Sequence, residues 1–311
     1  MFRGITLVPL DVNIRFIPRK TWFFAFSALL MTISIGLFLI KGLSYGIDFK
    51  GGILIEVRTQ QPADIADMRG RLSSLGLGDV SLQGFGDAKE VLIRVQRQEG
   101  GEAEQQAAVG KVKTALGPGI EYRRTEYVGP QVSEELFWDG VMAVAFSMLG
   151  ILIYVWFRFE WQFGVAAIVA LMHDVVSTIG IFSLLNMEFN LTTVAAVLTI
   201  AGYSINDTVV VFDRVRENLR KYKKMPLPEL LNGAINQTLS RTVITGGTTL
   251  MAVLALYLLG GEVIRGFSFA ILWGIVIGTY SSVCVASPLL LYLNISRGGK
   301  VAAGAAAEQS P

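Results

Sequence analysis

The chain has 311 residues, of which 52% are hydrophobic and only 17% are charged. Soluble domains carry about 25% charged residues, so this composition excludes an ordinary soluble protein and indicates a membrane protein. The formal net charge of +2 is too small to indicate nucleic-acid binding. A single cysteine and a single histidine exclude an intrachain disulfide and a multi-histidine metal centre, so we expect no metal and no cofactor.

The first apolar segment runs from Trp22 to Ile40 and follows the basic residues Arg15, Arg19 and Lys20. Its length of about 20 residues suits one crossing of a hydrocarbon layer ~30 Å thick. No small-residue cleavage site precedes the end of the segment. We therefore predict a retained membrane helix over residues 21–41, preceded by a cytoplasmic N-terminal segment over 1–20.

Residues 42–135 form the only substantial polar stretch. Alternating apolar residues such as Ile53, Ile55 and Val57 predict strands, and two helical segments lie between the strands. We expect the first of these helices to begin at Pro62. The order strand–helix–strand–strand–helix–strand is that of a ferredoxin-like α+β unit. We therefore predict a small extracytoplasmic (periplasmic) βαββαβ domain between the first and second membrane helices.

The C-terminal half contains further apolar segments long enough to cross a membrane. The predicted spans are 137–157, 163–185, 191–212, 239–259 and 267–293. Together with the first helix they predict a polytopic α-helical membrane protein with six transmembrane helices, the last five forming a bundle over 136–293. Residues 294–311 have low complexity and predict a disordered cytoplasmic tail.

The orientation follows from the basic residues in the loops. The loop over residues 213–238 carries six Lys and Arg residues, whereas the loop over 186–190 carries none. Basic loops remain in the cytoplasm. With six spans, both termini are therefore expected in the cytoplasm, and the domain over 42–135 is expected outside it.

Three charged residues lie within the predicted spans, namely Asp174, Asp207 and Arg241. Charged residues are costly at this depth and by default mark functional sites. At 1.5 Å per residue, Asp207 lies ~7.5 Å and Arg241 ~3 Å from the cytoplasmic ends of their spans. Because the two depths nearly match, we predict an ion pair between the fourth and fifth helices.

Polar residues accompany these charges at helical spacing. They are Thr199, Tyr203 and Asn206 beside Asp207, Thr245 beside Arg241, and Ser177 and Thr178 beside Asp174. Polar stripes that face lipid are costly. We therefore expect the three stripes to converge on a hydrated or hydrogen-bonded interior.

Two interpretations of the charged residues remain open. The protonation state of a carboxylate at this depth depends on its distance from a guanidinium. Protonation could therefore shift the equilibrium between two ways of packing the helices, so Asp207, Arg241 and Asp174 are candidates for proton coupling. Alternatively, Arg241 anchors its helix at the interface and the pair only holds helices together. A hydrolase built on His173 and Asp174 lacks a nucleophile or metal set, so we expect no enzyme.

Several motifs carry a family resemblance. They are "YGIDFKGG" after the first span, "VGPQV" before the second, "MHD" in the third, "GYSINDTVVVFDRVREN" in the fourth and "SRTVITGGTTL" at the start of the fifth. Over residues 20–293, the chain resembles the SecD/SecF family of bacterial protein-export membrane proteins.

The resemblance implies half of an RND-type transporter that pairs with a SecD-type partner and associates with the SecYEG channel. Such a protein lies in the cytoplasmic (inner) membrane, in contact with lipid, and uses the proton-motive force to promote export of unfolded preprotein. By motif, Asp207 and Arg241 match family positions tied to proton coupling. Asp48, Gly51 and Gly52 match the DFxGG motif, where the outward domain meets the membrane.

Other functions remain to be weighed against this expectation. An RND-like exporter of lipids or small molecules requires an apolar substrate pocket in the outward domain. A purely structural stabiliser of the translocon uses the charged residues only to hold helices together. Coupling to sodium in place of protons also remains open.

Overall fold

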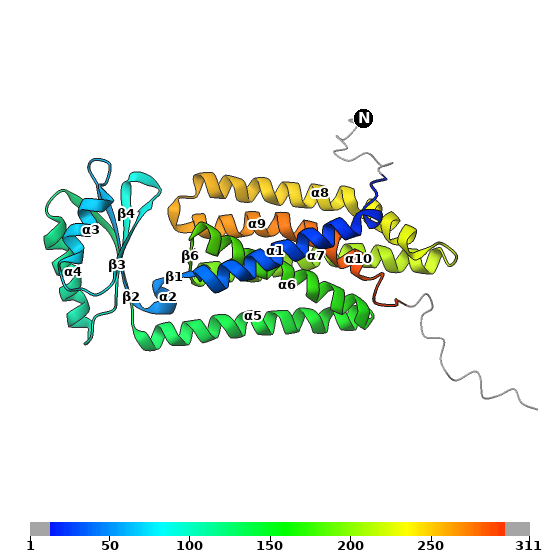
Figure 1. The fold of residues 1–311 in the computed structure, drawn as a ribbon, viewed down its shortest axis with the longest axis horizontal. Coiled ribbons are helices and arrows are strands. Elements are labelled where there is room, and N and C mark those ends of the chain that lie inside the picture. Colours follow the sequence, from blue (N-terminus) through cyan, green and yellow to red (C-terminus); the bar gives the residue numbers. More distant parts are fainter. Residues whose placement is uncertain (1–12, 296–311) are drawn as a thin grey trace, which may run out of the picture.

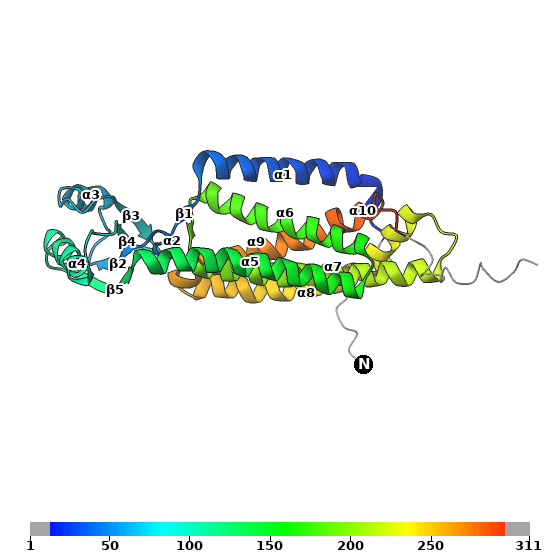
Figure 2. The ribbon, with the colours of Figure 1, turned by 90° about the horizontal axis from the view of Figure 1, so that it is seen from below.

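Six long helices lie side by side in a bundle, and a small α/β domain projects from one end of it (Figure 1, Figure 2). The computed structural model describes residues 13–295. Each of the six helices is long and apolar enough to cross a membrane, which confirms the predicted six-helix membrane architecture. The predictions for residues 1–12 and for the tail from residue 296 onward lie outside the described residues.

The bundle consists of α1 (Lys20–Lys41), α5 (Pro130–Arg158), α6 (Trp161–Leu185), α7 (Leu191–Lys221), α8 (Leu227–Leu259) and α9 (Arg265–Ser281). A π-helical turn over Ser282–Ala286 continues α9 into α10 (Ser287–Leu289). Local sequence sets several of these ends. Gly42 ends α1 at a positive φ of 71°, and the side chain of Asn190 caps α7 by accepting a hydrogen bond from the Thr193 amide.

Helices α7 and α8 extend well beyond the predicted spans. Residues 213–221 and 227–238 were expected in a loop, but they are helical. Apolar residues of this hairpin, including Leu219, Leu230 and Ile235, are buried in one core with Ile17 and Leu290. Hydropathy detects only the membrane-crossing part of each helix, whereas this core stabilises the helices outside that part.

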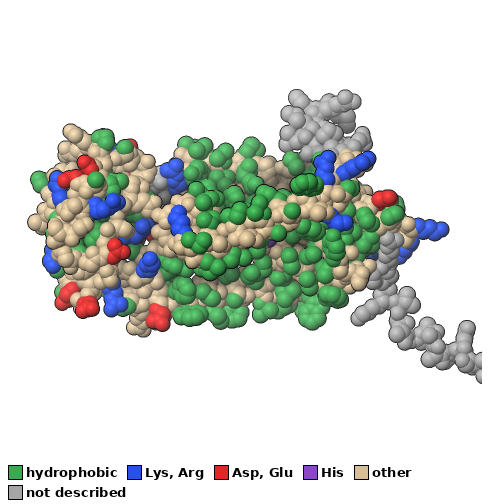
Figure 3. Space-filling model, viewed as in Figure 1, with side chains coloured by type: hydrophobic (Ala, Val, Ile, Leu, Met, Phe, Trp, Pro, Cys, Tyr) green, Lys and Arg blue, Asp and Glu red, His purple; other side chains and the backbone are tan. Residues whose placement is uncertain are grey.

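Helices α6, α7 and α9 form the centre of the bundle, and α1, α5 and α8 cover it with largely exposed apolar side chains. Figure 3 shows these side chains as an apolar band between two more polar ends. Helix α9 packs closely on α7 through Gly274 and Gly278. A Cβ atom at Gly274 would lie 2.2 Å from Ile200, so only glycine permits this approach.

The projecting domain contains β2 (Gly52–Thr59), α3 (Ile65–Ser73), β3 (Val80–Phe85), β4 (Asp87–Val95), α4 (Glu102–Leu116) and β5 (Ile120–Val128). Its antiparallel sheet has the order β3-β4-β2-β5, and the elements follow the predicted βαββαβ sequence. Helix α3 begins at Ile65 rather than at Pro62, because the Asp64 side chain accepts hydrogen bonds from the amides of Ala66 and Asp67.

Short elements join this domain to the bundle. Strand β1 (Ser44–Tyr45) pairs in parallel with β6 (Glu188–Phe189), the connection between α6 and α7. Helix α2 (Ile47–Lys50) follows β1 and leads directly into β2. The start of the domain is therefore attached to the loop from which α7 begins.

Candidate functional site

Asp207 lies on α7 and is 4% exposed. Its Oδ2 atom has no hydrogen-bond partner among the described residues. The Thr279 hydroxyl of α9 is near enough to interact with the carboxylate, but it does not reach the geometry of a hydrogen bond to Oδ2. Because buried polar atoms are nearly always hydrogen-bonded, this oxygen is unusual.

Two further buried polar atoms near Asp207 share this property. The Tyr203 hydroxyl, one turn earlier on α7, and the Thr279 hydroxyl form no hydrogen bond of good geometry among the described residues, although Thr245 and Thr249 of α8 lie near the Tyr203 hydroxyl. Both oxygens lie 3.6 Å from the position that a Cβ atom on Gly246 of α8 would occupy. Side chains of α7 and α9 thus bring unsatisfied oxygen atoms together at a glycine of α8. We define Tyr203, Asp207, Gly246 and Thr279 as the open polar site.

Arg241 does not form the predicted ion pair with Asp207. Both side chains are described, and no ion pair joins them, although Arg241 is the cation whose charge acts on Asp207. Arg241 is exposed on α8, whereas Asp207 is buried beside α9. The two side chains therefore differ in burial, and sequence spacing alone did not reveal this difference.

The polar stripe on α7 also divides between two sides. Thr199 and Asn206 are exposed, contrary to the expected interior position, while Tyr203 is half-buried. Thr245 of α8 is half-buried and donates a hydrogen bond to the Arg241 carbonyl at 2.9 Å. The exposed part of the stripe therefore faces away from the open polar site.

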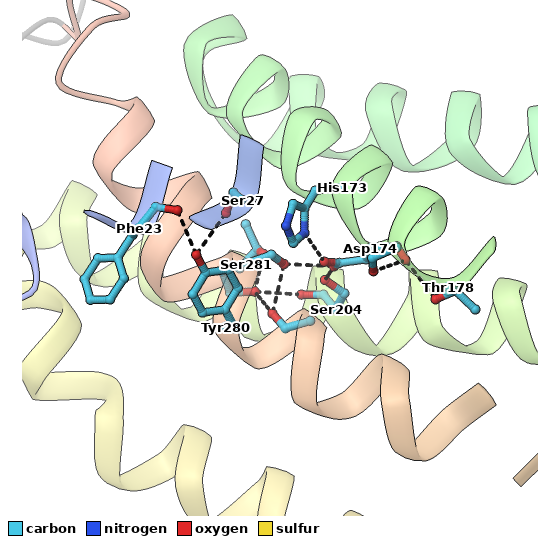
Figure 4. Close-up of polar contacts among 12 residues, drawn as sticks. Phe23, Ser27, His173, Asp174, Thr178, Ser204, Tyr280 and Ser281 are labelled. Atoms are coloured by element: carbon cyan, nitrogen blue, oxygen red, sulfur yellow. Dashed lines mark hydrogen bonds and ion pairs between the residues drawn. The ribbon is translucent and has the colours of Figure 1, made fainter. Parts of the chain in front are cut away.

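Asp174 on α6 is completely buried, and both oxygens of its carboxylate have hydrogen-bond partners (Figure 4). Oδ2 accepts hydrogen bonds from Ser204 of α7 at 2.6 Å and from Ser281 of α9 at 2.8 Å. Oδ1 lies 3.1 Å from Nδ1 of His173. The Ser177 and Thr178 hydroxyls donate to the Asp174 carbonyl instead of the carboxylate. One carboxylate thus joins the three central helices, and we call these four residues (His173, Asp174, Ser204 and Ser281) the closed polar site.

The closed polar site continues toward α1 through aromatic and hydroxyl groups. The His173 ring lies 5.9 Å from that of Tyr280. The Tyr280 hydroxyl donates to the Phe23 carbonyl and is 2.9 Å from the Ser27 hydroxyl (Figure 4). His173 Nε2 is buried and has no partner among the described residues.

Sequence reasoning missed Ser204, Ser281 and Thr279. Ser204 lies one turn before Asp207, and Thr279 to Ser282 form a polar run inside an apolar segment. Both signals were present in the sequence. Their partners, however, depend on how α6, α7 and α9 are rotated against one another.

The junction motif forms a third site. Asp48 Oδ2 accepts a hydrogen bond of 2.9 Å from the amide of Leu191, the first residue of α7. Gly52 has a φ of 122°, and a Cβ atom there would lie 2.7 Å from the Val95 carbonyl, so a larger residue is excluded. Gly51 likewise has a positive φ, of 69°. The motif therefore connects β2 directly to the start of α7.

An ion pair strengthens this junction. Arg94 of β4 pairs with Glu188 of β6, and both side chains are only partly exposed. This pair was not predictable from local sequence patterns, because the two residues are 94 positions apart in the chain. Elsewhere, the residues that the structure describes include no group of three or more His, Cys, Asp or Glu side chains that could hold a metal ion.

Comparison with known proteins agrees with this architecture. Residues 108–296 match the family model for protein export membrane protein SecD/SecF, C-terminal, and residues 36–63 match the SecD/SecF GG motif. The chain is 47% identical to protein translocase subunit SecF of Cereibacter sphaeroides, covering 95% of this chain and 94% of that protein. It is 49% identical to the subunit of the same name from Magnetococcus marinus, over 94% and 96% of the two chains.

The structure also resembles a larger protein. It superposes on SecDF, a translocon-associated membrane protein from Thermus thermophilus, with a TM-score of 0.84 and 39% sequence identity. The match covers 92% of this chain but only 39% of the SecDF chain. On these grounds the chain belongs to the SecD/SecF family of protein-export membrane proteins, in which it is similar to the SecF subunits of protein translocase.

Proposed function

We propose that this chain is a non-enzymatic, proton-coupled subunit that promotes the export of unfolded preproteins across the bacterial cytoplasmic membrane. It works without a cofactor, and the proton gradient is its energy source. The observation that carries the proposal is the open polar site, where Asp207 Oδ2 and the hydroxyls of Tyr203 and Thr279 are buried without hydrogen bonds.

The open polar site suits a group that changes its protonation state. An unpaired carboxylate oxygen can take up a proton without first losing a hydrogen bond, and a protonated carboxyl group can donate to a neighbouring hydroxyl. Arg241 of α8 is the cation whose charge acts on Asp207. Protonation therefore changes the attraction between α7 and α8 and selects between two packings of these helices. Moving one charge through 100 mV supplies ~2.3 kcal/mol for this selection.

The exposed polar side of α7 and α8 supports a SecD-type partner in the membrane. Thr199, Gly202 and Asn206 on α7 and Arg241 on α8 are exposed in this chain. An arginine exposed to lipid is costly, so a second subunit with polar side chains is expected to cover this side. The SecDF chain, of which this chain matches 39%, contains additional protein that can fill this role.

The distribution of charge supports the orientation. Basic residues gather at the end of the bundle opposite the α/β domain (Figure 3). By the positive-inside rule, that end and both termini lie in the cytoplasm, and the domain over residues 42–135 faces outward. There it is positioned to contact preprotein that emerges from a SecYEG-type channel.

The proposal is tested with membrane vesicles that contain the assembled translocase, by measuring preprotein translocation with and without a proton-motive force. Asp207→Asn and Arg241→Met should abolish the stimulation by proton-motive force while the complex with the SecD-type partner remains intact. Asp139→Asn, which makes the same change at an exposed residue of α5, is the control and should keep the stimulation. Full stimulation in both charge variants would refute the proposal.

Two other outcomes identify the alternatives. Loss of the purified complex in Asp207→Asn would indicate a purely structural role. If the stimulation survives a protonophore but requires a sodium gradient, the coupling ion at this site is sodium and not the proton.

A further inference from the structure

A hollow of about 570 Å³ lies at the basic end of the bundle, where α5 ends beside the extended part of α7. Its lining residues are Arg158, Asp213, Arg216, Glu217, Arg220 and Lys221. Asp213 lies six residues beyond Asp207, about 9 Å further along α7. The hollow is therefore separate from the open polar site.

The hollow has an excess of positive charge. Asp213 pairs with Arg158 at 3.1 Å, and Glu217 pairs at 2.8 Å with Arg214, which is not part of the lining. Both carboxylates are thus neutralised. The remaining lining cations have no carboxylate partner in the described part of the chain; they are Arg216, Arg220 and Lys221. Such a site favours an anionic ligand.

Two of the guanidinium groups are held in place. Those of Arg158 and Arg216 lie over the ring of Phe159, at 5.2 and 5.9 Å from its centre. Arg216 also donates a hydrogen bond of 3.0 Å to the Arg158 carbonyl. The Phe159 ring is buried and packs on Phe212. Because a buried ring fixes them, these guanidinium groups lose little conformational entropy when they bind a phosphate.

The surroundings of the hollow favour a lipid. The last turns of α5 expose Tyr154, Trp156 and Phe157, and Trp161 at the start of α6 is also exposed. Aromatic side chains of this kind collect where hydrocarbon meets lipid headgroups. The hollow therefore lies at headgroup level, next to a surface that suits acyl chains.

We propose that this hollow binds the phosphodiester headgroup of an anionic phospholipid. Arg216, Arg220 and Lys221 contact the phosphate, and the aromatic end of α5 contacts the acyl chains. A ligand at this place lies against both α5 and α7, so it joins the extended end of α7 to the outer layer of the bundle.

The test measures binding of phosphatidylglycerol to the full-length protein in detergent, by native mass spectrometry and by the shift in thermal unfolding. Phosphatidylcholine, which carries the same phosphodiester but no net charge, serves as the zwitterionic comparison. The variant is Arg220→Glu, which changes an exposed side chain that lines the hollow. Lys224→Glu is the matched control, because it makes the same change of charge at an exposed residue outside the lining.

The affinity for phosphatidylglycerol should fall roughly thirty-fold in Arg220→Glu. The substitution changes the charge of the site by two units, and each unit changes the affinity by a factor of roughly five. Lys224→Glu should bind as the unchanged protein does. If Arg220→Glu does not fold, Arg220→Gln replaces it, with an expected loss of roughly five-fold. Equal losses at positions 220 and 224 would overturn the proposal in favour of general charge attraction. Equal stabilisation by soluble glycerol 3-phosphate would overturn it in favour of a free-phosphate site.

Discussion

Two carboxylates are buried in the centre of this bundle, and their surroundings differ. Asp174 in the closed polar site accepts hydrogen bonds from α7 and α9 and contacts its neighbour His173. Asp207 in the open polar site has an oxygen with no partner among the described residues. Both are almost inaccessible to solvent, so burial does not distinguish them.

The difference lies in what a change of protonation requires. Protonation of Asp174 alters the acceptor that Ser204 and Ser281 share, and so alters contacts that join three helices. Protonation of Asp207 at Oδ2 breaks no hydrogen bond. We infer that Asp174 chiefly fixes the packing of α6, α7 and α9, and that Asp207 is the group that changes state.

The largest expected effect contrasts the two sites directly. Asp174→Ala leaves His173, Ser204 and Ser281 without their shared acceptor, and it should lower the free energy of unfolding by about 3 kcal/mol, or about 1 kcal/mol per contact. Asp207→Ala should cost less than about 1 kcal/mol, because it removes no hydrogen bond from Oδ2. The measurement is unfolding in mixed detergent micelles. Equal losses would remove the distinction between the sites.

A second change fills the open polar site without altering its polar groups. The added methyl group in Gly246→Ala lies 3.6 Å from the hydroxyls of Tyr203 and Thr279, a distance that the packing tolerates. It should reduce the stimulation by proton-motive force roughly tenfold, or ~1.4 kcal/mol, because it hinders the one hydrogen bond that a protonated Asp207 would donate to a neighbouring hydroxyl. The adjacent Gly247→Ala is the control, because its methyl group meets nothing within 4 Å. Similar results for both variants would show that the space beside Asp207 is unimportant.

The smallest expected effect concerns the serine that α7 contributes to the closed polar site. Ser204→Ala removes the 2.6 Å hydrogen bond to Asp174. It should lower stability by about 0.6–1.5 kcal/mol and leave the stimulation of translocation intact. Ser177→Ala, which affects only a bond to the Asp174 carbonyl, is the comparison and should cost less. A strong loss of stimulation in Ser204→Ala would assign the closed polar site a direct part in coupling.

Much of the architecture follows from local patterns in the sequence. Long apolar segments predict the six helices, and the alternation of Ile53, Ile55 and Val57 predicts the strand at the centre of the small domain. These features depend on the spacing of hydrophobic residues along the chain, which does not change with the elements that pack against a helix or strand.

The sequence was less informative where the result depends on rotation between helices. Asn206 and Asp207 are adjacent, yet one is exposed and the other buried. The hydrogen bonds of Asp174 join residues of α6, α7 and α9 that are up to 107 positions apart in sequence. The extension of α7 and α8 likewise depends on a core formed with Ile17 and Leu290, and hydropathy does not detect such a core.

The length and end contacts of α7 give it a mechanical role. Its 31 residues form one uninterrupted helix ~46 Å long. Asp48 holds its first amide at the junction with the α/β domain, and Asp207 lies near its middle. A shift of α7 along its axis would therefore be transmitted through Asp48 to the start of β2. A label placed on β2 would then report the protonation state of Asp207, half a helix length away.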